Sequence, residues 1–422
     1  MDPGWDDGGD DVEPLARRRN PLVMVIAVVV AFALAAGGVI VAVGRNGEDD
    51  LGREVTDGGE TGTGNVAPTT QAPPSPPSAA ELEAVVAEIS DFVAAARELE
   101  FVTPVEVTLL DDEDFTARIQ EDAVEDLEEM AETESVLRAF GLLDDDDHLA
   151  DALTSFLGAG VVGFYDPESG ELVVRGAAIT PYVRLTLAHE LTHALDDQHF
   201  ELHRPALDEA DDEAGFAFGG LVEGNAVRVE DEYRETMSDE ERRQARDEEL
   251  ALGAGFDFED IPRVLPQIIG FPYIYGPIFV RALLDDGDED RIDAAYRDPP
   301  VTSEQVLDPT GWLRGEADPV TVPPPEAGGE VFDEGVLGLW GVVLLLEEHL
   351  GQQEAIKAAS GWGGDWYVAW REGDRACVRT TFVMDTNDDL RDLASALDEW
   401  AAAEDDAEVD RGDASVTITS CA

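Results

Sequence analysis

The chain has 422 residues, 44% of them hydrophobic, so it can bury one large core or two smaller ones; this excludes a fibrous or wholly disordered protein. The 95 acidic and 27 basic residues leave a formal net charge of -68, which disfavours any role in binding nucleic acid phosphates. At about 1 M salt the Debye length falls to roughly 3 Å and screens this self-repulsion, which favours a salty habitat.

The N-terminal region is typical of a membrane anchor. Arg17, Arg18 and Arg19 close a tail of 20 residues, and residues 21–44 then carry no charge. A helix of this length spans roughly 36 Å, enough to cross a bilayer. The arginines predict a cytoplasmic N-terminus and an extracytoplasmic remainder, in a single-pass protein of the cell membrane. Ala33-Leu34-Ala35 leaves a cleavable signal peptide as the alternative.

Residues 45–80 are rich in Gly, Thr, Pro and Ser and have no apolar periodicity, which predicts a flexible linker. The folded part is expected to begin near Glu81, where apolar residues recur at helical spacing. A strand over 105–110 and a charged helix through Met130 are expected to follow. Two β-favouring runs, 161–164 and 172–174, flank a turn sequence and predict a hairpin.

A helix is expected to start at about Pro181 and to carry the sequence His189-Glu190-Leu-Thr-His193. Residues four apart lie on one face of a helix, so both imidazoles can reach the same ion. Glu190 is rotated by about 100° from His189, which places its carboxylate beside the water that the ion activates. The spacing predicts a zinc site with Glu190 as general base.

A catalytic zinc needs a third protein ligand, and two residues compete for this role. His199 has the position required by the longer pattern H-E-x-x-H-x-x-G-x-x-H, but Asp196 replaces its glycine and no convincing Met-turn follows. Glu223 is a single carboxylate in an apolar helical segment, where burial without a partner would cost several kcal/mol. The sequence therefore favours His189, His193 and Glu223 as the metal ligands, with His199 as the alternative.

Helices are expected to continue to about Tyr296, and a long apolar helix over 336–350 should precede two or three strands and a final helix. This order predicts an α+β protein with a catalytic domain over 81–320 and a C-terminal α+β subdomain over 321–422. Cys377 and Cys421 are the only cysteines and both lie in that subdomain. In an extracytoplasmic domain we expect them to form a disulfide, closing a loop of about 44 residues worth roughly 4 kcal/mol.

The segment from His189 to Asp197 resembles the zinc helix of the gluzincins, the thermolysin-like metallopeptidases, including an aspartate four residues after the second histidine. The resemblance implies a zincin-like fold, mostly helical with a small sheet, and zinc-dependent hydrolysis of peptide bonds. It also implies a glutamate ligand from a later helix, which falls on Glu223, and a supporting role for Asp197. The match covers about nine residues, and 30 positions separate His193 from Glu223, so the chain resembles a divergent zincin-like group.

Zincins bind peptide as an added strand, and residues 160–164 are the expected sheet edge, with an ordinary core hairpin as the alternative. Tyr273 or Tyr275 is expected to donate a hydrogen bond to the oxyanion, unless these rings only pack. The predicted function is an extracytoplasmic zinc metallopeptidase. Two alternatives remain open: a cell-surface binding or sensory protein with a structural or idle zinc site, and a metal hydrolase acting on other amide bonds.

Overall fold

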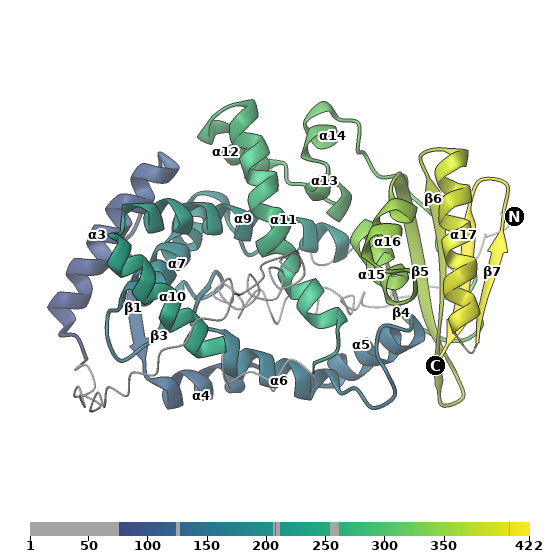
Figure 1. Ribbon diagram of the computed structural model, residues 1–422, viewed down its shortest axis with the longest axis horizontal. Helices are drawn as coiled ribbons and strands as arrows, with labels where there is room; N and C mark the ends of the chain where they lie inside the picture. The colour runs from purple at the N-terminus through teal and green to yellow at the C-terminus, as the bar shows by residue number, and fades with distance from the viewer. Residues whose placement is uncertain (1–75, 124–126, 206, 208–211, 254–260, 405) are drawn as a thin grey trace, which may run out of the picture.

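The computed structural model describes residues 76–123, 127–205, 207, 212–253, 261–404 and 406–422 (Figure 1). The predicted cytoplasmic tail, the predicted transmembrane helix over 21–44 and most of the predicted linker lie outside the described residues. The described chain is mixed α+β, with helices and a small sheet at one end of Figure 1 and a larger sheet at the other.

The first described helix, α3 (Ala79–Arg97), begins where the apolar periodicity places it. Its start is fixed by a capping box, in which the Ser78 side chain accepts from the backbone N–H of Glu81 and the Glu81 carboxylate accepts from Ser78. Next come β1 (Val107–Leu110), α4 (Asp112–Ala123), α5 (Leu127–Ala139) and α6 (Leu149–Gly160). The expected single charged helix through Met130 is therefore wrong, because two helices, α4 and α5, occupy this region.

A three-stranded sheet lies beside the histidine helix. Strands β2 (Gly163–Asp166) and β3 (Glu171–Arg175) form the predicted antiparallel hairpin, and β1 pairs with β3 in parallel, giving the order β1-β3-β2. Gly170, with a φ of +73°, closes the turn in a conformation that glycine adopts without strain. Strand β2 is therefore an edge strand of this sheet.

The histidine helix, α7 (Pro181–Phe200), starts at the predicted residue. The Thr180 side chain accepts from the backbone N–H of Val183, and Pro181 occupies the first helical position, where its missing N–H costs nothing. Most of its side chains are buried, because α3, α9 (Asp212–Thr236), α10 (Asp239–Gly253) and both strands of the hairpin pack around it.

Helix α11 (Val264–Asp286) packs against α9, and two glycines permit the contact. A Cβ on Gly224 would lie 2.2 Å from the backbone carbon of Gly276, so no other residue fits without moving a helix. Although α11 is long and apolar enough to cross a membrane, 56% of its most apolar window is buried inside the protein, as expected for a core helix. Three short helices follow: α12 (Glu289–Arg297), α13 (Ser303–Leu307) and α14 (Pro309–Arg314).

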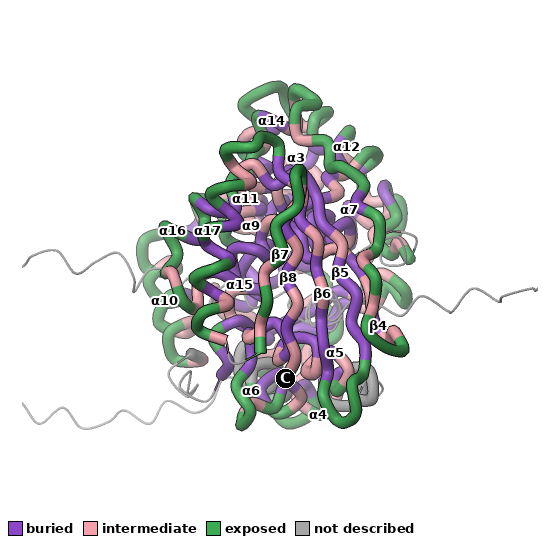
Figure 2. Tube along the Cα trace, turned by 90° about the vertical axis from the view of Figure 1, so that its right-hand side faces the viewer, coloured by how far each residue is buried: buried purple, intermediate pink, exposed green. Residues whose placement is uncertain are grey.

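The C-terminal part is built on a five-stranded antiparallel sheet, with the order β4-β5-β6-β8-β7 (Figure 2). Its elements are β4 (Val331–Gly335), α15 (Gly338–Leu350), α16 (Gln352–Ala359), β5 (Trp362–Glu372), β6 (Arg375–Met384), α17 (Asn387–Ala403), β7 (Ala407–Arg411) and β8 (Val416–Cys421). The expected apolar helix corresponds to α15, but the sequence indicated too few strands. Buried residues of this sheet and of α9 and α11 belong to one continuous apolar core.

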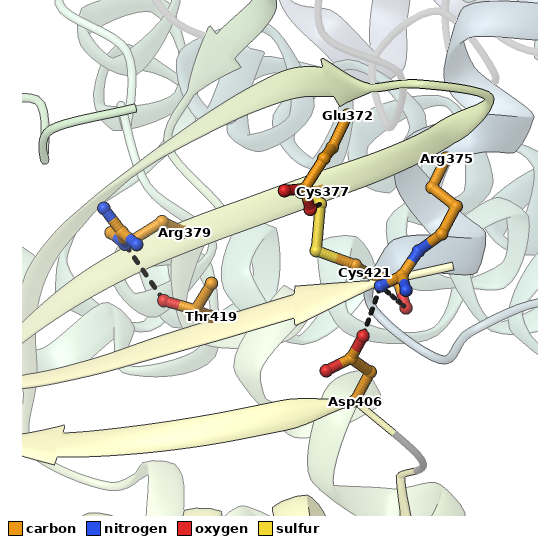
Figure 3. Close-up of a disulfide and its surroundings, with 7 residues drawn as sticks. All are labelled: Glu372, Arg375, Cys377, Arg379, Asp406, Thr419 and Cys421. Carbon is orange, nitrogen blue, oxygen red and sulfur yellow. Dashed lines mark hydrogen bonds and ion pairs between the residues drawn. A yellow bond between two sulfur atoms is a disulfide. The ribbon is translucent and has the colours of Figure 1, made fainter. Parts of the chain in front are cut away.

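The predicted disulfide is present. Cys377 on β6 faces Cys421 on β8, and their sulfur atoms are 2.00 Å apart (Figure 3). Beside it, Arg379 donates to the Thr419 hydroxyl at 2.9 Å, and Arg375 pairs with an aspartate at the start of β7. Because both sulfurs are bonded to each other, neither cysteine is available as a metal ligand.

Candidate metal centre

The three predicted ligands meet between α7 and α9. His189 Nε2 lies 3.2 Å from Glu223 Oε2, and His193 Nε2 lies 3.6 Å from the same oxygen. One ligand atom from each of the three side chains falls within 4.8 Å of the others. All three residues are at most 2% exposed, so the cluster is shielded from bulk solvent.

Several polar atoms of this cluster lack hydrogen-bond partners among the described residues. They are both ring nitrogens of His193, Oε1 of Glu223 and both carboxylate oxygens of Glu190. Buried polar atoms without partners are costly and rare in folded proteins. Two imidazoles and one carboxylate form a donor set that zinc uses in catalytic sites, so the residues present fit a zinc ion.

The electrostatics of the cluster favour a cation. Burial lowers the pKa of His189, but the facing carboxylates of Glu223 and Glu230 outweigh it and raise this pKa to about 10. Burial also raises the pKa of Glu190 well above its usual range, and the charges of Glu223 and Glu230 add to this shift. A positive ion would relieve this repulsion and keep Glu190 ionised.

Glu230 is a further residue of the candidate site, and the sequence pattern alone did not indicate it. Its Oε2 lies 3.3 Å from His189 Nδ1, and its Oε1 accepts from Arg234 Nη2 at 2.6 Å. A carboxylate on the far nitrogen of a ligand histidine fixes the tautomer and orientation of the ring. The spacing in the sequence could have indicated Glu230, because it follows Glu223 by seven residues and so lies on the same face of α9.

Of the two candidate tyrosines, only Tyr273 belongs to the cluster. Its ring stacks near the His189 ring, with centroids 6.4 Å apart, and its hydroxyl has no hydrogen-bond partner in the described part of the chain. Burial, together with the charges of Glu223 and Glu190, raises the pKa of Tyr273 well above its usual range, so the phenol stays a donor. Tyr275 instead packs against the rings of Phe271 and Trp340.

His199 and Asp197 lie outside the cluster. His199 is exposed, and its Nε2 contacts the backbone carbonyl of Glu100 at 2.8 Å. The Asp197 carboxylate accepts from the Tyr165 hydroxyl and from the backbone N–H of Leu202, both at 2.8 Å. The geometry therefore disfavours His199 as third ligand. The hydrogen bonds of the Asp197 carboxylate go to Tyr165 and Leu202, and none to His189 or His193 is present among the described residues.

A family model described as a domain of unknown function, DUF8575, matches residues 328–420. These residues form most of the C-terminal sheet and its helices, and they do not include the candidate metal centre. No curated protein matches the chain. No solved structure matches it either.

Proposed function

We propose that this chain is a zinc-dependent metallopeptidase. The observation that carries the proposal is the buried cluster of two imidazoles and the Glu223 carboxylate, with the unpartnered Glu190 carboxylate next to it in the motif. A purely structural zinc site has no need of Glu190. A buried carboxylate that is left without a partner is instead typical of a group kept for proton transfer.

His189, His193 and Glu223 would hold the ion. When bound, zinc supplies Lewis acidity, which acidifies water and polarises a peptide carbonyl. Glu190 then accepts the proton of the attacking water and returns it to the leaving amine. Tyr273 donates its hydroxyl proton in a hydrogen bond to the oxyanion that develops on the carbonyl oxygen.

Strand β2 is the candidate binding edge for an extended peptide. It is an edge strand and packs tightly on the histidine helix, since a Cβ on Gly163 would lie 2.7 Å from Thr186 Cγ2 and 3.4 Å from Glu190 Cγ. A peptide added to this edge would run past Glu190, with its backbone rather than its side chains providing the hydrogen bonds.

The proposal places the catalytic part outside the cytoplasm, anchored by the N-terminal apolar segment. The Cys377–Cys421 disulfide supports this location, because disulfides persist in oxidising compartments. The strongly acidic composition further favours protein or peptide substrates over nucleic acid.

The test is Glu190→Gln, which nearly preserves side-chain shape but cannot accept a proton from water. General-base catalysis contributes a factor of about 10² to 10⁴, so hydrolysis of a peptide library should fall by that factor while zinc content stays unchanged. Glu235→Gln is the matched control, because Glu235 is an exposed acid on α9. A Glu190→Gln variant with parental turnover would contradict the peptidase mechanism and favour a structural zinc site.

A further inference from the structure

A closed ring of five side chains, three of them buried and two partly buried, ties the two ligand-bearing helices together just beyond the candidate metal centre. Asp196 on α7 is three residues after His193, and Asn225 on α9 is two residues after Glu223. Asn225 Nδ2 donates to Asp196 Oδ2 at 2.6 Å, and both residues are 0% exposed. This bond directly links the helix that carries the histidines to the helix that carries the glutamate.

The ring is completed by one residue from each of two further helices and by Arg228 on α9. Arg97, in the last turn of α3, donates to Asp196 Oδ1 at 2.8 Å and also pairs with Glu289 on α12. Glu289 lies 3.1 Å from Arg228 Nη1, and Arg228 Nη2 donates to Asn225 Oδ1 at 2.8 Å. Each of the five side chains therefore bonds to two neighbours in the ring.

Two residues outside the ring, Tyr296 and Asp293, bond to its most deeply buried charged groups. Tyr296 donates its hydroxyl to Asp196 Oδ2 at 2.8 Å, so this carboxylate accepts three hydrogen bonds. Arg97 Nη2 donates to Asp293 Oδ1 at 3.1 Å, so its guanidinium faces three carboxylates, and its side chain is 0% exposed. Charges held this deep lose their hydration, and such a network specifies position more than it adds stability.

We infer that Arg97, acting through Asp196 and Asn225, is a positioning residue for the zinc ligands. Apolar helix surfaces tolerate small slides along one another, whereas directional bonds to buried charges hold one register. That register sets the distance between His193 and Glu223. The helix that follows the predicted linker would thus be part of the catalytic unit rather than a spacer. This inference rests on the zinc site proposed above.

The experiment measures metal affinity rather than hydrolysis, so it separates this inference from the peptidase mechanism. Full-length Arg97→Met and Asn225→Ala are titrated with zinc against a competing chelator in about 1 M salt. Supporting groups around metal ligands typically affect affinity by 10-fold to 100-fold, so each variant should bind zinc about 10-fold to 100-fold more weakly. Cobalt-loaded samples should also show a shifted visible absorption spectrum, which reports ligand geometry.

Two controls address charge and stability. Arg281→Met removes one exposed arginine from α11 and should leave zinc affinity and the cobalt spectrum unchanged. Leu397→Ala, in α17 of the C-terminal part, should lower the melting temperature without changing either readout. Since Asn225→Ala removes no charge, it keeps the test decisive if Arg97→Met fails to fold.

Parental zinc affinity and an unchanged cobalt spectrum in Asn225→Ala would overturn the inference. Equal losses of affinity in Leu397→Ala would overturn it as well, because they would trace the effect to stability alone. A parent that binds no zinc would refute both the proposed function and the inference before any variant is compared. A different outcome would refute the inference only: Glu190→Gln loses hydrolysis, while Arg97→Met and Asn225→Ala bind zinc with parental affinity.

Discussion

Replacing Glu230 by alanine should weaken zinc binding about 10-fold to 100-fold while all three proposed ligands remain. Glu230 lies 3.3 Å from His189 Nδ1 on the side of the ring opposite the Glu223 contact, which is made through Nε2. The negative charge of Glu230 makes the His189 imidazole a stronger electron-pair donor to a metal ion. The hydrogen bond from Nδ1 to Glu230 also keeps Nε2 directed at the other two ligands. Without the Glu230 carboxylate, the His189 ring can rotate, and its interaction with a zinc ion should weaken.

The loss of zinc affinity in Glu230→Ala has two contributions, the lost negative charge and the lost hydrogen bond to His189. A loss of 10-fold to 100-fold corresponds to about 1.4 to 2.7 kcal/mol of binding free energy. Glu230→Gln keeps an oxygen that accepts from Nδ1–H but removes the charge, so its affinity should lie between those of the parent and Glu230→Ala. The Arg234 guanidinium, which donates to Glu230 Oε1 at 2.6 Å, loses a partner in both variants.

Competition with a chromogenic chelator at constant pH and about 1 M salt would measure these affinities. The matched controls are Glu235→Gln and Glu235→Ala, which make the same chemical changes at an exposed position on the same helix. If Glu230→Ala bound zinc within two-fold of Glu235→Ala, on the order of the scatter expected for distant sites, the orienting role of Glu230 would be refuted.

Three further results are expected. Glu223→Ala should lower zinc occupancy in metal analysis far more than His199→Ala, because Glu223 lies within 3.6 Å of both histidines whereas His199 contacts a backbone carbonyl; the opposite ranking would point to His199 as ligand. Tyr273→Phe should lower kcat about 100-fold with zinc content unchanged, and a parental kcat would exclude it as oxyanion donor. Burial raises the pKa of Asp333 to about 7 from the ordinary 3.8, so the folded state retains a proton that the unfolded chain loses as pH rises through this range. Asp333→Asn should therefore stabilise the fold at about pH 8 by up to about 4 kcal/mol of unfolding free energy, seen as a higher melting temperature. A gain that persisted at about pH 4 would show that the raised pKa of Asp333 is not its cause.

The contacts within the candidate site that could be anticipated from the sequence depend on local geometry. His189 and His193 fall on one face of α7 because helical spacing alone determines it, and the structure places both rings together. Glu223 could be selected because a lone carboxylate in an apolar helix needs a partner. The disulfide could be predicted because the chain has only two cysteines.

The parts that were missed depend on contacts between distant segments. Arg97 and Asp196 are 99 residues apart, and no pattern within either helix indicates that they meet. At position 196 the sequence indicated only a missing glycine, whereas the structure shows a carboxylate with three donors. The strands β7 and β8 were missed for a related reason, since a short strand is defined mainly by its neighbours in the sheet.

The composition and the buried ring together explain how such an acidic chain can hold a precise site. In the predicted salty habitat, salt screens the repulsion among exposed acids, but it weakens exposed ion pairs equally. Arg97 and Asp196 have fully buried side chains, so dissolved ions screen their interaction much less. If the inference above holds, the geometry of the proposed metal centre depends in part on the Arg97–Asp196 contact, which dissolved salt screens little, and surface charge can serve solubility. It follows that high salt should raise the melting temperature of the parent and of Asn225→Ala alike, and should not restore the zinc affinity of Asn225→Ala.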